Sequence, residues 1–180
     1  MNRTNENEML SRRVVWLRGD LTTYSTTKAI SKLLFLQSED PHLPIHLILD
    51  SDGGDAIGGF AVIDAMNQIT CPVYTFAPIC AHAIAAIVLA NGEPKYRLLT
   101  DRTELSFVSC VTEPENVEQQ KTERALIDQI IEITGNDRAK IVSDHSTNRF
   151  FDPTSAIEYN LADSIVDSYP HADLNAGIGG

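Results

Sequence analysis

Residues 45–69 read IHLILDSDGGDAIGGFAVIDAMNQI, and this stretch decides the fold. Its first six residues are rich in branched apolar side chains and predict a buried strand over 45–50. From residue 56 onward, Phe60, Ile63 and Met66 recur at helical spacing and predict a helix over 56–69. The segment between the two elements is short and holds two adjacent glycines. Residues 45–69 therefore form a strand, a tight turn and a helix.

The Gly53-Gly54 pair in this turn has two interpretations. Adjacent glycines accept positive φ and expose consecutive N–H groups, so the turn can bind an anion or a developing oxyanion. A plain tight connection is the simpler alternative, because glycine pairs are common in turns. A phosphate-binding P-loop is excluded, since no Gly-Lys-Ser or Gly-Lys-Thr follows.

The same alternation of strand and helix extends outward on both sides. Strands are predicted over 13–19 and 73–77, and a helix is predicted over 22–38. An alanine-rich helix is expected from about Cys80, ending at Asn91-Gly92. This order predicts an α/β domain with a largely parallel sheet.

The second half of the chain is more helical. Amphipathic spacing predicts a helix over 116–134 that ends at Gly135, and Asp137 is a suitable N-cap for another helix reaching about His145. A last helix is expected near Pro153, with a closing strand over 161–167. Two short strands are expected over 97–99 and 105–111. The late helices indicate a helical element attached to the α/β domain.

Composition narrows the classes of function. The chain has 180 residues, enough for one domain, and 43% of them are hydrophobic. It carries 14 basic and 25 acidic residues, a net charge of −11, which disfavours nucleic acid and anionic membrane surfaces as partners. No stretch is long enough to span a bilayer, and the polar N-terminus is no signal peptide. The three cysteines form no C-x-x-C pair, which indicates reduced thiols and a cytoplasmic location.

Several segments together resemble a known family. RVVWLRGDL, LLFLQSEDP, LILDSDGGDAIGGFAVIDAM and LANG follow in the order found in the proteolytic subunit of the Clp protease family, ClpP. The resemblance runs from about Leu10 to Val108 and resumes over 135–167. It implies the ClpP/crotonase-like fold, with repeated ββα-type units and a protruding handle, and a ring assembly fed by an ATP-driven AAA+ unfoldase. The expected parts are a short flexible segment at 1–10, the ClpP-like domain at 11–169 and a flexible tail at 170–180.

Active members of the family carry a Ser-His-Asp triad, and the resemblance places its three positions here. The serine pattern falls on residues 81–86, AHAIAA, so the nucleophile position is Ala83. The histidine position is Val108, and the aspartate position, before Arg149, is Asn148. Methyl, isopropyl and amide groups cannot attack, accept the proton or orient an imidazolium. The chain is therefore predicted to be catalytically inactive, like the ClpR-type paralogues.

Two other departures concern the turn and the handle. The oxyanion-hole positions implied by the family are Gly54 and Ile84. Asp52 replaces a proline of the family; it either opposes an oxyanion by its charge or caps the following helix in an Asx-type turn. The handle is shortened around 109–120, and Pro114 is unsuited to edge pairing, which weakens the case for ring stacking and peptide docking.

Other catalytic sets have simpler structural explanations. Cys80 and His82 flank the nucleophile position, but at the start of a helix residues i and i+2 point to different sides. Ser143-Asp144-His145 fits a solvated helix end, and Ser106 an ordinary strand position without a nearby histidine. His42 and His46 have no carboxylate at metal-ligand spacing. The sequence thus predicts no metal and no cofactor.

Three hypotheses follow, in order of preference. The first is a non-catalytic ClpP-like subunit that joins a ring, with itself or with catalytic Clp subunits, and contributes to assembly or unfoldase docking. The second is a freestanding crotonase-fold binding protein that self-assembles, and the third is a hydrolase with relocated catalytic residues. An oligomer is expected because one small domain cannot cover the apolar side chains Leu33, Leu34, Phe60 and Met66 together.

Overall fold

A five-stranded sheet forms the centre of the protein. The computed structural model describes residues 3–107 and 116–169. Each pair of neighbouring strands in this sheet runs parallel, in the order β1-β2-β3-β5-β8. The strands are β1 (Val14–Arg18), β2 (Ile45–Asp50), β3 (Val73–Ala77), β5 (Arg97–Leu99) and β8 (Ser164–Ile165). The predicted α/β class with a largely parallel sheet is confirmed.

A second, three-stranded sheet continues from the end of the first. Its strands are β4 (Cys80–His82), β6 (Glu104–Ser106) and β7 (Phe150–Phe151), with β4 and β6 parallel and β7 antiparallel to β6. A parallel bridge between Ser51 and Ala81 joins β4 to the residue that follows β2. The turn after β2 is thereby held against β4.

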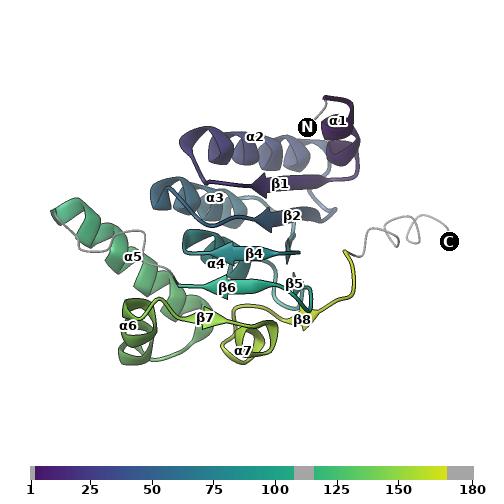
Figure 1. Ribbon diagram of the computed structural model, residues 1–180. Helices are drawn as coiled ribbons and strands as arrows, with labels where there is room; N and C mark the ends of the chain where they lie inside the picture. The colour runs from purple at the N-terminus through teal and green to yellow at the C-terminus, as the bar shows by residue number, and fades with distance from the viewer. Residues whose placement is uncertain (1–2, 108–115, 170–180) are drawn as a thin grey trace.

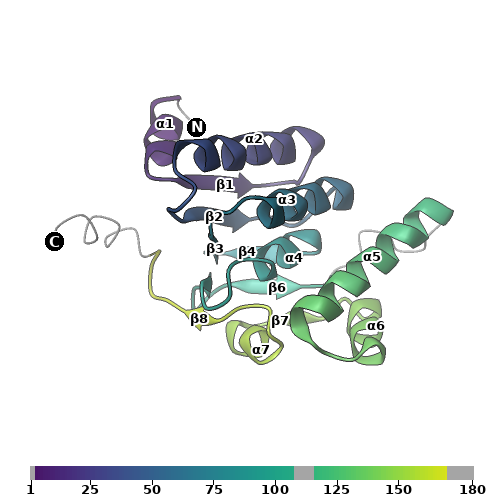
Figure 2. The ribbon, with the colours of Figure 1, turned by 180° about the vertical axis from the view of Figure 1, so that it is seen from behind.

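Three helices cover one face of the strands. Figures 1 and 2 show α2 (Thr23–Glu39), α3 (Ala56–Gln68) and α4 (Ile84–Ala90) stacked one below another on the same side. All seven residues of α4 are buried, which is why its sequence is apolar all round. Leu33 and Met66 are buried in this core, so the domain covers two of the four side chains expected at an oligomer interface, whereas Leu34 stays exposed.

The opposite face of the sheet carries a smaller apolar cluster. Val14, Ile48 and Phe76 form it. Each is next in sequence to a residue that faces the helices, because successive strand residues point to opposite faces of the sheet. Met9 packs against this cluster from helix α1 (Arg3–Ser11). Residues 3–10 of the segment expected to be flexible are helical, and both Lys28 and Lys32 bind Glu6 of this helix at 2.6 Å.

The C-terminal helices lie at one end of the sheet. They are α5 (Val117–Thr134), α6 (Arg138–Ser146) and α7 (Pro153–Glu158), and α5 projects furthest from the strands (Figures 1 and 2). Asn116 caps α5, Gly135 ends it in the left-handed conformation, and Asp137 caps α6 as predicted. Residues 108–115, which hold most of the expected short handle, and the expected tail at 170–180 lie outside the described residues. The domain limits themselves stay predictions.

The prediction was wrong where strand and helix meet near residue 80. The alanine-rich helix begins at Ile84 and not at Cys80, because residues 80–82 pair with β6 as a strand. The two-residue strand β7 was also missed, since two residues are too few for a period to be visible. Within the described ranges, no helix has the length and hydrophobicity that a membrane crossing needs.

Candidate active site

The connection between β4 and α4 has the backbone geometry of a nucleophile turn. Ala83 links the two elements with φ at +50° and ψ at −128°, a conformation that costs a non-glycine residue about 1–3 kcal/mol. Its N–H donates to the carbonyl of Ser106 at 2.9 Å, which holds the strained residue in place. Sharp strand-to-helix turns of this kind present a catalytic side chain in hydrolases. Here the side chain is a methyl group.

The Gly53-Gly54 turn lies directly beneath Ala83. The φ angles are +102° at Gly53 and +132° at Gly54. A Cβ on Gly53 would lie 2.9 Å from the Cβ of Ala83, and one on Gly54 would lie 2.5 Å from the carbonyl oxygen of Leu21. Both positions therefore need glycine, because neighbouring atoms leave no room for a Cβ. The turn forms one wall of the site.

The two residues expected to form an oxyanion hole, Gly54 and Ile84, lie on either side of Ala83 in the fold, in the glycine turn and at the start of α4. Ile84 is the first residue of α4, so its N–H has no acceptor within the helix. The N–H of Leu21 donates to the carbonyl of Gly53, and the carbonyl of Leu21 accepts from the N–H of Asp55. In a parallel bridge of this type, the N–H of the middle residue, Gly54, points away from Leu21. The assignment of an oxyanion hole to these two positions stays a prediction.

Apolar side chains close the space behind Ala83. A cavity of about 10 Å³ lies there, lined by α4 and by Phe107, Leu126, Ile130 and His145. That volume is at the lower limit for one water molecule. Ala83 itself is 8% exposed, so the position is poorly open to a substrate from this side.

The structure describes one of the other two predicted triad positions. Asn148 is exposed in the turn after α6, with φ at +51° and its N–H bonded to the carbonyl of His145 at 3.1 Å. Val108 lies outside the described residues. A histidine does lie near Ala83, namely His145 in the closed cavity, although it comes from α6 and not from the predicted position.

A model of the Clp protease family matches residues 2–169, nearly the whole chain. The chain belongs to the Clp protease family. This membership confirms the family resemblance and, with the parallel sheet and its helices, the ClpP-like fold. It identifies the chain as a ClpP-like subunit at the level of the family.

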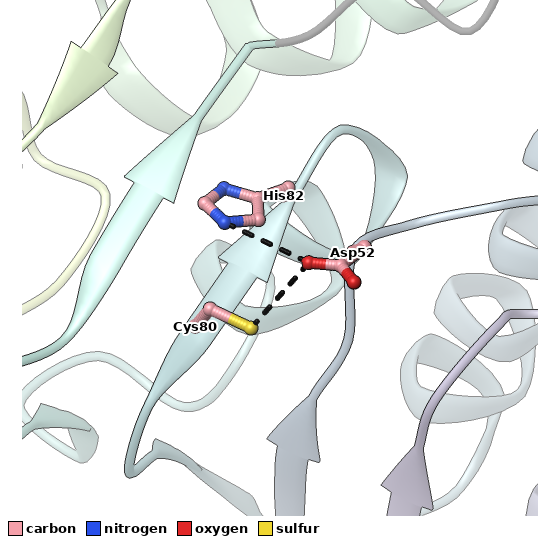
Figure 3. Close-up of side chains that lie close together, drawn as sticks. All are labelled: Asp52, Cys80 and His82. Atoms are coloured by element: carbon pink, nitrogen blue, oxygen red, sulfur yellow. Dashed lines mark hydrogen bonds and ion pairs between the residues drawn. The ribbon is translucent and has the colours of Figure 1, made fainter.

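In this Clp family chain, the strand at 80–82 changes what Cys80 and His82 can do. Residues i and i+2 of a strand point to the same face, so the expectation of opposite sides is wrong. Figure 3 shows both side chains directed toward Asp52, which stands in the turn after β2. The Asp52 carboxylate Oδ1 lies 3.8 Å from the Cys80 thiol and 3.9 Å from the His82 Nε2.

Ser106 is a further partner that sequence reasoning missed. Its Oγ lies 2.8 Å from the His82 Nδ1, because β4 and β6 pair in a register that sets the two residues side by side. Ser106, His82 and Asp52 therefore form a Ser-His-Asp series. Ser106 is 0% exposed, so its hydroxyl cannot reach a substrate carbonyl, and the series orients the imidazole without supplying a nucleophile.

Cys80 is also unsuited to nucleophilic attack. Burial, together with the neighbouring carboxylates of Asp50 and Asp52, raises the pKa of the Cys80 thiol to about 11. The thiol is thus protonated at neutral pH, and the thiolate is the reactive form. The sequence held no local signal for this cluster, because three residues are too few to show a strand period and the surrounding alanines favour a helix.

Two local interpretations need correction. Asp52 does not cap α3; Asp55 does, by accepting from the N–H of Ile57 at 3.0 Å. Asp144-His145 is not a solvated helix end. The carboxylate of Asp144 accepts from the Tyr159 hydroxyl at 2.7 Å, and burial lowers the pKa of His145, an effect that nearby Glu123 partly opposes.

Proposed function

We propose that this chain is a non-catalytic subunit of a Clp protease assembly, comparable with the ClpR-type paralogues, which joins a ring with catalytic Clp subunits. The observation that carries the proposal is Ala83. Its strained backbone is that of a nucleophile turn, but its side chain has no atom that can attack a carbonyl. The proposed roles are ring assembly and docking of an AAA+ unfoldase in the cytoplasm, without a cofactor.

The described residues offer no replacement nucleophile at this turn. Ser106 is buried, and the thiol of Cys80 is protonated at neutral pH. An oxyanion hole without a nucleophile and a base retains little catalysis. The hypothesis of relocated catalytic residues therefore loses its two strongest candidates.

Exposed apolar side chains support assembly. Leu34 and Phe35 on α2 are about half exposed, and Tyr24 and Ile57 are more so. Subunit interfaces bury side chains of this kind in large, core-like areas. Single rings, or double rings completed by a partner with a full-length handle, are the expected form.

The test of inactivity uses the purified full chain, fluorogenic peptides and a fluorophosphonate probe. We expect no cleavage and no labelling, and labelling that maps to a serine of this chain would refute the proposal. In the triple variant Ala83→Ser, Val108→His, Asn148→Asp we expect little or no activity, since the serine would sit in a site 8% exposed and closed by apolar groups.

The test of assembly is native mass spectrometry of the chain expressed alone and with a catalytic paralogue. Mixed rings support the proposal. Homo-oligomers that never include the paralogue would favour a freestanding, self-assembling binding protein instead. A monomer of 19.8 kDa in both experiments would rule out both assemblies.

A further inference from the structure

Three metal-ligating side chains converge beside the nucleophile turn. Cys80 and His82 share one face of β4, and Asp52 reaches them from the turn after β2 (Figure 3). One donor atom from each, the thiol sulfur, the Nε2 and a carboxylate oxygen, lies within 4.8 Å of the other two. The convergence depends on strand pairing and on a bridge between Ser51 and Ala81, so it is built into the fold.

The spacing of the donors suits a small tetrahedral ion. Ligands of a tetrahedral Zn²⁺, with bonds of about 2.0–2.3 Å, lie about 3.4–3.6 Å from one another. The Asp52 oxygen is 3.8 Å from the Cys80 sulfur and 3.9 Å from the His82 nitrogen. Shifts of a few tenths of an ångström bring the Asp52 oxygen to ligand spacing, and its exposed side chain is free to rotate by that much. The Cys80 sulfur and the His82 nitrogen lie within 4.8 Å of each other and close on the ion by side-chain rotation.

The buried Ser106 holds the imidazole of His82 through its Nδ1. The Ser106 Oγ lies 2.8 Å from the Nδ1, and it accepts a hydrogen bond in the tautomer that carries the ring proton on Nδ1. With Nδ1 protonated, the lone pair of Nε2 faces Cys80 and Asp52. Metal-binding histidines usually donate their second ring N–H to such an outer partner, which fixes the ring orientation.

The nearest carboxylates have different roles. Asp50 is paired with Arg18 at 3.0 Å and is largely buried, so it serves the fold. Glu104 is exposed and its Oε1 lies 3.8 Å from the His82 Nε2. The fourth coordination position is thus open toward solvent, next to Glu104.

We propose that Asp52, Cys80 and His82 form a binding site for a divalent transition-metal ion, with Zn²⁺ the best fit, oriented by Ser106 and completed by water. The Cys80 thiol releases its proton to solvent when the ion binds, and thiolate, imidazole and carboxylate together match the preferences of Zn²⁺. Three protein ligands with one open position are found at zinc sites that bind water. The site goes beyond the proposed ring function and does not depend on it.

The first experiment titrates the metal-free full chain with Co²⁺ and reads the absorption spectrum. A tetrahedral Co²⁺ with one thiolate gives a sulfur-to-metal charge-transfer band and visible d–d bands. We expect both in the wild type, saturating at one ion per chain, and competition by Zn²⁺. Absence of these bands at micromolar protein would overturn the proposal.

Ligand variants assign the bands to named side chains. Cys80→Ser abolishes the charge-transfer band, whereas the matched variant Cys71→Ser keeps it. His82→Ala lowers Zn²⁺ affinity by more than the roughly 10–100-fold that an outer-shell partner contributes, and the exposed control His42→Ala does not. A band or affinity unchanged in Cys80→Ser and His82→Ala would contradict the site.

Two more variants keep the test independent of folding. Asp52→Asn changes an exposed side chain, so its circular dichroism stays that of the wild type while Zn²⁺ affinity falls; Asp64→Asn on α3 is the control. Ser106→Ala leaves all three ligands in place and is expected to weaken Zn²⁺ binding about 10–100-fold through loss of the histidine orientation. Equal affinity in Asp52→Asn and the wild type would remove Asp52 from the site.

Discussion

Two polar clusters of the molecule are built on opposite principles. Around Arg97, each donor meets an acceptor: its Nη2 and Nε donate to the Asp163 carboxylate at 2.6 and 2.9 Å, and its Nη1 donates to the carbonyl of Asn160 at 2.9 Å. Burial would raise the pKa of Asp163, but the hydrogen bonds and charge of Arg97 outweigh this and hold it below the ordinary value. The Arg97 cluster is complementary within itself.

The cluster of Asp52, Cys80 and His82 lacks that complementarity. The Asp52 carboxylate lies 3.8 Å or more from the other two members, and Arg18, which could balance a carboxylate here, is bound to Asp50. Asp52 has a side chain that is 85% exposed and therefore kept hydrated. Buried, paired charges stabilise a fold, whereas ligand atoms that converge at a surface without a cationic side chain are suited to binding a cation.

The largest expected effect is the loss of the matched cluster. Arg97→Met keeps the apolar stem but leaves the Asp163 charge without its partner, and breaking a buried pair in this way costs about 3–5 kcal/mol. Urea unfolding followed by circular dichroism measures the change. The exposed control Arg102→Met should stay within about 0.5 kcal/mol of wild type. A loss below about 1 kcal/mol for Arg97→Met would show that the cluster contributes little to stability.

Substitution in the glycine turn is expected to cost less stability than loss of the Arg97 pair and more than a change at Asp52. Gly54→Ala places a Cβ 2.5 Å from the backbone oxygen of Leu21 and strains a residue at φ +132°, so we expect a loss of about 2–4 kcal/mol. The matched control is Gly135→Ala, which has positive φ but open space around its Cβ and should cost about 1–2 kcal/mol. Equal losses in thermal unfolding would mean that contact with Leu21 is unimportant.

A third, smaller effect belongs to the docking of α1. Hydrogen bonds from Lys28 and Lys32 lower the pKa of Glu6 to about 2 from an ordinary value of 4.5. A depressed carboxyl pKa stabilises the folded state above pH 4.5, and this contribution is lost as pH falls toward 2. Because the pair is near the surface, we expect about 0.2–1 kcal/mol. Glu6→Gln should remove this part of the acid dependence, and Glu8→Gln should not.

The sequence predicted the larger elements because their signals are periodic or terminal. The apolar run at 45–50, the helical spacing from Phe60 to Met66, the helix end at Gly135 and the N-cap Asp137 act locally, so neighbouring residues contain the information. The strained turn at Ala83 was not predicted, because the alanine-rich helix was expected to begin at about Cys80. Its conformation depends on Ser106, 23 positions away, and could not be derived from local spacing.

The cluster of metal-ligand side chains could not be predicted for the same reason. A three-residue strand has no period of its own, and β4 exists only because β6 and the residue after β2 pair with it. Once residues 80–82 are extended, Cys80 and His82 share a face, and Ser106 lies opposite His82. Tertiary pairing overrode the helical propensity of the alanines.

The smallest expected effect on stability best distinguishes the role of the Arg97 cluster in stability from the role of the Asp52 cluster in binding. In the metal-free chain, Asp52→Asn removes one of two carboxylates near the Cys80 thiol and breaks no buried pair, so the free energy of unfolding should change by less than about 0.5 kcal/mol. Asp163→Asn, by contrast, leaves the Arg97 charge buried and should cost several kcal/mol. Parallel urea titrations in the presence of a chelator compare the two isosteric changes directly. If Asp52→Asn were as destabilising as Asp163→Asn, Asp52 would be part of the framework of the fold, and its convergence with Cys80 and His82 would be explained without a cation.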